Sequence, residues 1–406
     1  MKDSSVLKKR WLQYSFFAAS LVYAEEGYLS GIKEEQFRYD YRKASLQSDI
    51  LRDSWLAPIQ TYYSYGKSKQ YGGNGTTQTA AVSIDQPIFQ SGGIYYGIKF
   101  AEASRKYANL SVDAARTKAI KEAVDLLMRI RQSDLKIQKQ DLLIANTGLN
   151  LELKTEQYLH GELDSGFLDN AIIEKNLQTQ ALYDMQTARE RLISAYEAIS
   201  DLPHKDAVLP KLSLLDETTF SSDAIDMQLA RSDIEKGEWN QKVTLAKYLP
   251  RISLNTAYNW NRLENPAFAG TIMPITAESD YLTYGMKASV VFDVNQRREM
   301  EVARIETLKA NTVMEDKKRS LQSLYDQVKH NLENSDKKIA LAKSNRDLYE
   351  KLLLDTRELF RAGYKTEYDV NMLDNSAKIQ TIEIQILEYD RQLELLNLYE
   401  KVNGAI

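Results

Sequence analysis

The chain has 406 residues, a formal net charge of −4 and no cysteine. The lack of cysteine excludes disulfides, thiolate catalysis and cysteine-based zinc sites, and the acidic balance argues against nucleic-acid binding. A compact protein of this length would form two or three domains.

The N-terminal segment, residues 1–24, has the pattern of a secretory signal peptide. The basic group Lys8-Lys9-Arg10 precedes an apolar run from Trp11 to Val22, and Val22-Tyr23-Ala24 resembles a cleavage site. A short amphipathic helix is the alternative. Cleavage would move the net charge to about −7. Since no uninterrupted apolar run reaches about 18 residues, an exported chain of this kind is expected to be periplasmic, secreted or a β-barrel.

A helix is expected over residues 28–56, and two strands follow it. Residues 59–68 and 80–89 have the period-two alternation of half-buried strands. The glycine cluster at 70–75 between them is read as an exposed hairpin turn, because it lacks the lysine of a phosphate-binding loop.

Two stretches, residues 98–202 and 286–402, contain no proline and very little glycine. Proline breaks helix interiors and glycine weakens them, so both stretches are predicted to be long helical segments. A helix of ~65 residues at ~1.5 Å per residue would be roughly 100 Å long. The helical pattern resumes after Gly161 and Gly363, which predicts antiparallel hairpins with turns at 161–166 and 363–366.

The two stretches are copies of one another, related by a shift of 202 residues. Their apolar positions alternate steps of 4 and 3, a mean of 3.5 that is the coiled-coil period; an ordinary amphipathic helix is the alternative. The first turn is expected to hold one residue more than the second. The predicted seam is Ala119, Ala123, Leu126, Ile130, Ser133, Ile137, Gln140, Ile144, Thr147, Leu151, Lys154 and Tyr158 in the first copy, and Leu321, Tyr325, Val328, Leu332, Ser335, Ile339, Ala342, Arg346, Tyr349, Leu353, Thr356 and Phe360 in the second.

The second half of the chain repeats the order of the first. A proline-containing linker is followed by an expected helix over 222–247 and by alternating patterns over 251–260 and 281–292. The predicted organisation is therefore a signal peptide (1–24), a first repeat (25–202), a linker (203–220) and a second repeat (221–406).

The four predicted strands are of membrane-spanning length. About ten residues suffice for a tilted transmembrane strand, and many of the aromatic residues lie toward the strand ends, as in membrane girdles. A soluble sheet with one apolar face is the alternative. Four strands are too few to close a barrel, so a membrane barrel would need several chains, which predicts an oligomer.

This arrangement resembles the TolC family of outer-membrane export channels. The segment 85–93, with Pro87, Gly92 and Gly93, looks like the family's strand-to-helix swivel. The segments 158–169 and 360–370 look like its two helix-turn tips. Residues 56–59 and 248–252 resemble the approaches to its first strands, so the likeness covers nearly the whole mature chain.

The resemblance implies a mainly α fold with membrane β structure, in which a homotrimer builds a 12-stranded β-barrel continuous with a 12-helix α-barrel of coiled-coil hairpins. It implies a location in the Gram-negative outer membrane, in contact with lipid and extending into the periplasm. The partners implied are a periplasmic adaptor (membrane fusion protein) and an inner-membrane pump of a tripartite efflux or type I secretion system. Drugs, metal ions and secreted proteins all remain open as cargo.

The resemblance also implies a closed periplasmic entrance at the tips. By position, Asp169 and Asp369 resemble the family's acidic ring, which is expected to favour cations and to bind divalent metal as a block; a solvated side chain is the alternative for each. Lys365 and Phe360 stand where the family often has arginine and tyrosine, so the latch is expected to be weaker or to use Tyr364 and Tyr368 instead. The candidate gate and adaptor-docking residues are Gly161, Asp164, Asp169, Phe360, Gly363, Tyr364, Lys365, Tyr368, Asp369 and Asp374.

No enzyme, cofactor or resident metal site is expected. His160, His204 and His330 have no ligand-type neighbours at metal-binding spacing, and no nucleophile is accompanied by a base. Two other classes remain as alternatives to a channel: a periplasmic coiled-coil adaptor or scaffold, and a filament-like surface protein. The two in-phase hairpins disfavour the first, and the paired amphipathic strands disfavour the second.

Overall fold

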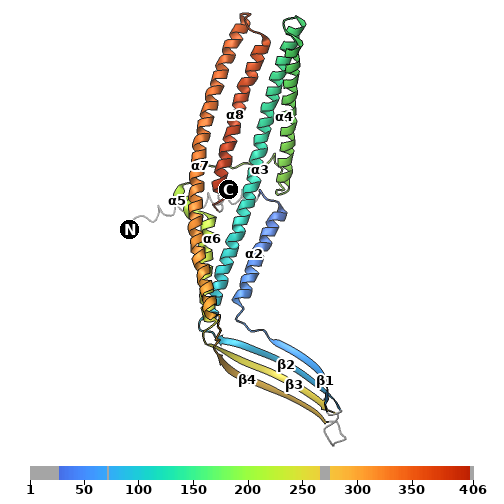
Figure 1. The fold of residues 1–406 in the computed structure, drawn as a ribbon, viewed down its shortest axis with the longest axis vertical. Coiled ribbons are helices and arrows are strands. Elements are labelled where there is room, and N and C mark those ends of the chain that lie inside the picture. The colour runs from blue at the N-terminus through green and yellow to red at the C-terminus, as the bar shows by residue number, and fades with distance from the viewer. Residues whose placement is uncertain (1–26, 71–72, 266–274, 403–406) are drawn as a thin grey trace, which may run out of the picture. The chain divides into compact units, whose positions relative to one another are not determined.

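The computed structural model describes residues 27–70, 73–265 and 275–402. The predicted signal peptide and part of the loop between the last two strands lie outside these ranges. The elements are α2 (Gly31–Arg52), β1 (Gln60–Gln70), β2 (Gly73–Phe89), α3 (Gly93–Leu159), α4 (Ser165–Glu197), α5 (Glu217–Asp223), α6 (Ile225–Ala246), β3 (Arg251–Asn265), β4 (Ile275–Ser289), α7 (Gln296–Arg361) and α8 (Glu367–Tyr399) (Figure 1). None of these helices is long and apolar enough to span a bilayer.

The chain folds into two compact units, each built from both sequence repeats. The sheet unit comprises Asp40–Ser111 and Gln228–Asp316. The helical unit comprises the described residues up to Tyr39, Val112–Met227 and those from Lys317 onward. The repeats predicted from the sequence are therefore not the compact units in space.

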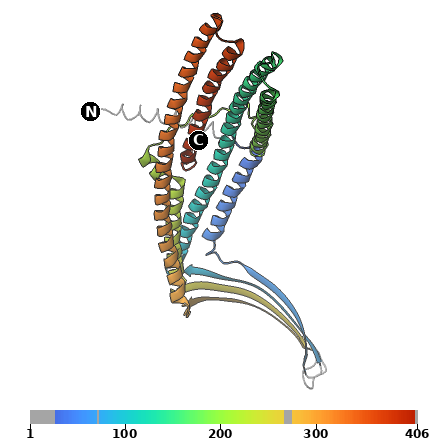
Figure 2. The same cartoon turned by 45° about the horizontal axis from the view of Figure 1, so that its top comes forward.

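The sheet unit contains one antiparallel sheet in the order β1-β2-β3-β4 (Figure 2). The pairing of β2 with β3 joins the two repeats. The strands run 11 to 17 residues, so they extend beyond most of the predicted bounds, although β4 ends at Ser289 rather than at the expected residue 292. β1 and β4 form the two edges of the sheet.

The two faces of this sheet differ in polarity over the part nearer the helices, whereas toward the loop end the apolar face also carries Lys67, Arg262, Glu264 and Glu278. Paired residues of antiparallel strands share a face, so the register assigns each side chain. One row of the apolar face joins Thr61, Val82, Tyr258 and Leu282, and the next joins Tyr63, Ala80, Trp260 and Asp280. The opposite face carries mostly Ser, Thr, Asn, Ala and Gly. Such a division suits a sheet with apolar surroundings on one side and water on the other.

Three helices of the sheet unit are held together by small residues and rings. A side chain at Gly237 of α6 would place its Cβ 3.1 Å from the Thr307 hydroxyl of α7, so glycine permits this close approach. Trp239 of α6 lies edge-on to Tyr95 of α3, with ring centroids 6.1 Å apart. These contacts place α6 between α3 and α7.

In the helical unit, α4, α3, α8 and α7 lie side by side in that order (Figure 1). The predicted seam of α7 is buried at eight of its twelve positions: Leu321, Tyr325, Val328, Leu332, Ile339, Ala342, Leu353 and Thr356. On α3 the buried residues spread beyond the seam and include Val124, Leu127 and Met128. The reason is that α3 packs against both α4 and α8, which widens the arc that is removed from water.

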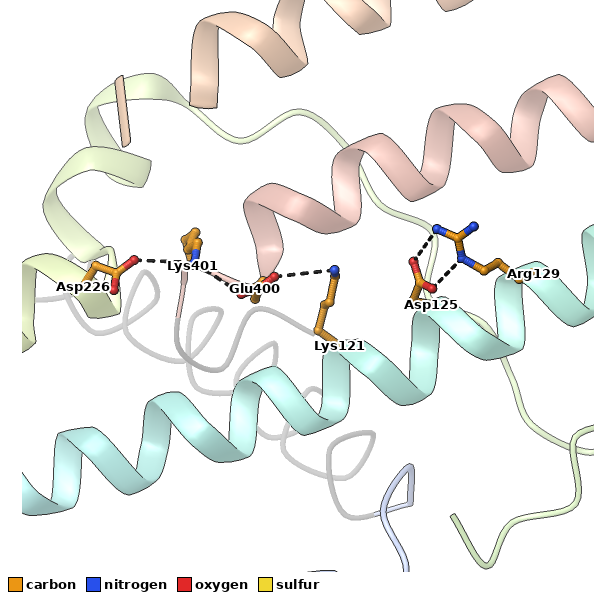
Figure 3. A network of polar contacts seen from close by, with 6 residues as sticks. All are labelled: Lys121, Asp125, Arg129, Asp226, Glu400 and Lys401. Atoms are coloured by element: carbon orange, nitrogen blue, oxygen red, sulfur yellow. Dashed lines mark hydrogen bonds and ion pairs between the residues drawn. The ribbon is translucent and has the colours of Figure 1, made fainter. Parts of the chain in front are cut away.

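The C-terminal end of α8 is tied to α6 and α3 by charged groups (Figure 3). Lys401 Nζ lies 3.5 Å from Asp226 and 3.2 Å from Glu400, and Glu400 lies 3.5 Å from Lys121. Burial alone would lower the pKa of Lys401, but the two carboxylates outweigh it and raise the pKa. The lysine therefore stays charged and bridges the two acids.

The helix predicted over residues 222–247 is wrong in one respect. Ala224 has an extended backbone (φ −55°, ψ 128°) that separates α5 from α6. It forms an antiparallel bridge with Val402, and the Ile225 N–H donates to the Lys401 carbonyl at 2.7 Å. Pairing with the C-terminal segment thus overrides the local helical pattern, which the sequence alone does not reveal.

Candidate functional site

Both hairpin tips end their long helix with the same backbone turn. Gly161 (φ +73°) and Gly363 (φ +81°) occupy the left-handed region that favours glycine. The Glu162 N–H donates to the Gln157 carbonyl at 2.8 Å, and the Tyr364 N–H donates to the Leu359 carbonyl at 2.9 Å. These are the six-to-one hydrogen bonds of a Schellman motif, so the two interruptions predicted from glycine are chain reversals of one type.

The expectation of an extra residue in the first turn is wrong. The next helices begin at Ser165 and Glu367, which preserves the shift of 202 through both turns. In the corrected register Asp164 corresponds to Thr366, and Asp169 has no acidic equivalent in the second tip.

The two tips differ in how the next helix is capped. Asp164 accepts a hydrogen bond from the Gly166 N–H at 2.8 Å. Thr366 and Asp369 form a reciprocal capping box, with Asp369 accepting from the Thr366 N–H at 2.9 Å. That backbone hydrogen bond, with help from the Thr366 hydroxyl and Lys365, lowers the pKa of Asp369. Asp369 is therefore an ionised cap whose Oδ2 already accepts from the Thr366 N–H and hydroxyl.

One hydroxyl at the tips joins the two hairpins. Tyr368 of α8 donates from its Oη to Glu156 of α3 at 2.8 Å, and this hydrogen bond is the main reason that the pKa of Tyr368 is raised. The other candidate, Tyr364, is 80% exposed, and Phe360 is also exposed. The structure thus brings Tyr368, rather than Tyr364, to a carboxylate of the other hairpin.

The remaining charged candidates fall into paired and unpaired groups. Asp374 lies 3.0 Å from Arg357 of α7 and 2.7 Å from Lys378. Lys365 lies 3.8 Å from Asp369. Asp169 is exposed and has no ion-pair or hydrogen-bond partner among the described residues. Among the acidic candidates of the tips, Asp169 is the one whose carboxylate has no partner in the part of the chain that the structure describes.

A ladder of polar contacts between α3 and α8 continues away from the tips. It was not predicted from the sequence. Gln132 donates to Asp390 at 2.6 Å and Lys139 to Glu383 at 2.8 Å. Asn375 donates to Asn146 at 2.9 Å. The signal that could have found it is the seven-residue spacing of Gln132, Lys139 and Asn146, a polar stripe beside the apolar seam.

The predicted swivel lies in the sheet unit, at the junction of β2 and α3. Pro87 supplies no N–H to the ladder, and the pairing with β3 is irregular between Pro87 and Phe89. Gly92 has φ +85°. At Gly93 a Cβ would lie 3.2 Å from that of Ala246, so the chain passes close to the end of α6.

Side-chain contacts fix this junction further. Gln86 accepts from the Ala57 N–H at 3.1 Å and donates to the Trp55 carbonyl at 3.2 Å. Ser91, which has φ +47°, donates to the Pro250 carbonyl at 2.7 Å. The segments that approach β1 and β3 are thus both attached to the junction, which the proline and glycines alone did not predict.

The sequence matches no protein-family model and no curated protein, whereas solved structures match over nearly the whole chain. The Campylobacter jejuni CmeC outer membrane channel has a TM-score of 0.74 at 11% identity and covers 96% of this chain and 86% of its own. The Vibrio cholerae outer membrane protein VceC has a TM-score of 0.69 at 14% identity, and the match covers 95% of this chain and 97% of VceC. The open state of the Neisseria gonorrhoeae MtrE outer membrane channel has a TM-score of 0.64 at 13% identity, and the match covers 96% of this chain and 89% of MtrE. These likenesses confirm that the chain has the fold predicted from the sequence, that of TolC-type outer membrane channels.

Proposed function

We propose that this chain is one protomer of a homotrimeric channel-tunnel in the Gram-negative outer membrane, serving a tripartite efflux or type I secretion system. The observation that carries the proposal is the incomplete amphipathic sheet. It has one apolar face and two edge strands, β1 and β4, each hydrogen-bonded to a neighbour on one side only among the described residues. In a bilayer such edges must be paired, and three copies would supply twelve strands.

The edge helices of the helical unit support the same assembly. On α7, Leu341, Leu348, Leu352 and Leu359 are exposed at coiled-coil spacing, each one residue before a seam position and so about 100° around the helix from the seam. On α4, the other edge, Ile173 and Leu177 are exposed. A second copy that packs α4 against α7 would bury both stripes, and three copies would close a tunnel of twelve helices.

In this proposal the hairpin tips form the periplasmic entrance and the docking surface for an adaptor linked to an inner-membrane pump. The Tyr368–Glu156 hydrogen bond would hold the two hairpins together at the entrance, and the α3–α8 ladder would maintain their alignment behind it. Pro87, Gly92 and Gly93 would turn the chain from barrel to tunnel. The outer-membrane channels of the same fold favour this function over a soluble adaptor or scaffold.

The assembly is tested by fractionation and mass measurement of the expressed full chain. A trimer that is extracted by detergent from outer-membrane fractions, and that dissociates on heating in SDS, is expected. Recovery as a soluble periplasmic monomer would overturn the channel and favour the adaptor or scaffold class.

The latch is tested with Tyr368→Phe, which removes one hydroxyl and keeps the ring. The loss of the link to Glu156 should raise single-channel conductance in planar bilayers several-fold, because the entrance is the narrowest part of the proposed path. Tyr364→Phe is the matched control and should leave conductance unchanged. Equal conductance in both variants would remove Tyr368 from the gate.

A further inference from the structure

The polar face of the sheet carries two aromatic residues among the described strand positions, Tyr62 on β1 and Tyr281 on β4. The register places them in one row, in which Tyr62 pairs with Ala81, Ala81 with Asn259, and Asn259 with Tyr281. Tyr62 is 55% exposed and Tyr281 49% exposed. Each edge strand thus carries a tyrosine in the same row of paired residues.

These two tyrosines differ from the other aromatic residues of the sheet. Tyr63, Tyr258, Trp260 and Tyr284 lie on the apolar face, where a membrane girdle accounts for them. Lipid contact cannot account for a large ring on the face opposite. The residues beside Tyr62 and Tyr281 on that face are mostly small, so their phenol groups reach furthest from the sheet.

We infer that Tyr62 and Tyr281 form a cargo-contacting site inside the barrel, specific for organic cations that carry aromatic rings. The inference rests on the proposed trimer, in which the polar face lines the pore. Each β4 edge would adjoin the β1 edge of another copy, so every junction would receive Tyr281 from one copy and Tyr62 from the next. Threefold symmetry puts the three Tyr62 side chains at one level and the three Tyr281 side chains at another.

The chemistry of the row favours a cationic aromatic ligand. Tyrosine rings attract cations over their faces and stack on other aromatic rings, and their hydroxyl groups form hydrogen bonds with polar substituents. No member of the row is charged. The charged residues of the polar face among the described strand positions, Asp85, Arg251 and Lys287, all lie several residues closer to the helices, so none of them neutralises the row or repels a cation within it.

The site is tested with rhodamine 6G, a planar aromatic cation, on the purified detergent-solubilised trimer. Equilibrium dialysis gives the affinity, and planar-bilayer recordings with the dye on the loop side give the block of current. The double variant Tyr62→Thr/Tyr281→Thr introduces a residue common on this face and should weaken binding and block at least several-fold. Tyr63→Thr/Tyr284→Thr is the control, because it removes one tyrosine from each of the same strands but on the apolar face.

A second variant separates ring chemistry from bulk. Tyr62→Leu/Tyr281→Leu keeps large side chains and should lose dye binding as the threonine variant does, and it serves alone where the threonine variant does not assemble. Unchanged dye affinity in the two variants that lack Tyr62 and Tyr281 would overturn the site. So would a loss of dye affinity in the control equal to theirs. A lower dissociation temperature of the trimer with unchanged dye affinity would assign these tyrosines to assembly instead. A wild-type chain that forms no trimer and no channel would refute the proposed function itself.

Discussion

The two helical hairpins are copies that occupy different places in the same row of helices. In the first hairpin the long helix α3 lies inside the row and α4 forms an edge, whereas in the second the long helix α7 forms an edge and α8 lies inside. Their interiors are still matched: Asp134 meets Arg189 at 2.5 Å, and Asp336 meets Arg391 at 2.9 Å, each 202 residues further on. The comparison shows that duplication preserved the inside of each hairpin, while position in the row determined the outer faces.

The largest expected effect is a difference in stability between alanine substitutions on the two faces of α7. Leu332 is 5% exposed on the seam and Leu341 is 64% exposed on the edge. Leu332→Ala should destabilise the fold by about 2–5 kcal/mol through lost burial and a cavity. Leu341→Ala should change the stability of the isolated fold by less than about 0.5 kcal/mol. Thermal unfolding followed by circular dichroism measures both.

The same pair of variants tests whether the edge is an interface. If Leu341 packs against another copy, its alanine variant should lower the temperature at which the trimer dissociates in SDS while the helical signal of the fold is retained. Equal effects of the two substitutions on unfolding would show that the seam and the edge are not distinct faces.

The seam of α7 also shows how far a sequence can predict this fold. A helix at the edge of the row buries mainly one heptad stripe, and eight of the twelve predicted positions of α7 are buried. The seam of α3 was a poorer guide, because a helix with two neighbours buries a wider arc and Val124, Leu127 and Met128 lie outside a single stripe. Period alone gives one face of a helix, and the number of neighbours comes from the tertiary fold.

The next effect concerns the duplicated ion pair. Asp134→Asn should destabilise the first hairpin by about 1–2 kcal/mol, because both partners are partly shielded and Arg189 would lose the less exposed of its two carboxylate partners. Asp336→Asn should cost less than about 1 kcal/mol, because Asp336 is well exposed. Denaturant unfolding compares the two, with Glu190→Gln as a control that removes only the exposed second partner of Arg189. Equal costs would show that position in the row does not affect the pair.

The tips were predicted well in their backbone and poorly in their side chains. Glycine in a helical pattern has one main conformational use, so Gly161 and Gly363 identified both turns. The link between Tyr368 and Glu156 joins residues 212 positions apart, and nothing local in either segment specifies it. Asp369 looked like a ring residue because of its charge, but its spacing from Thr366 is that of a capping box.

A smaller effect distinguishes the caps of the two second helices. Thr366→Ala removes the capping box and should destabilise the start of α8 by about 1 kcal/mol, seen as faster hydrogen exchange of the amides in its first turn. Because the folded pKa of Asp369 lies below its ordinary value of 3.8, its contribution should be complete above about pH 5 and should be lost as pH falls through the folded value. Protection factors of the first-turn amides of α8, which remove the intrinsic pH dependence of exchange, should fall over this range, and constant protection factors would contradict an ionised cap.

The smallest expected effect is on ion selectivity and contrasts two aspartates that the sequence treated as equivalent. Asp169 has an exposed carboxylate without a described partner, whereas Oδ2 of Asp369 accepts hydrogen bonds from the Thr366 N–H and hydroxyl. Asp169→Asn should reduce the cation-to-anion permeability ratio about twofold, because three unscreened charges would be removed from a narrow entrance. Asp369→Asn should change the ratio less while loosening the tip, and reversal potentials across a salt gradient measure both. A larger selectivity change for Asp369 would mean that its carboxylate faces the ion path despite its cap, and a ratio unaffected by either change would remove the acidic ring from the entrance.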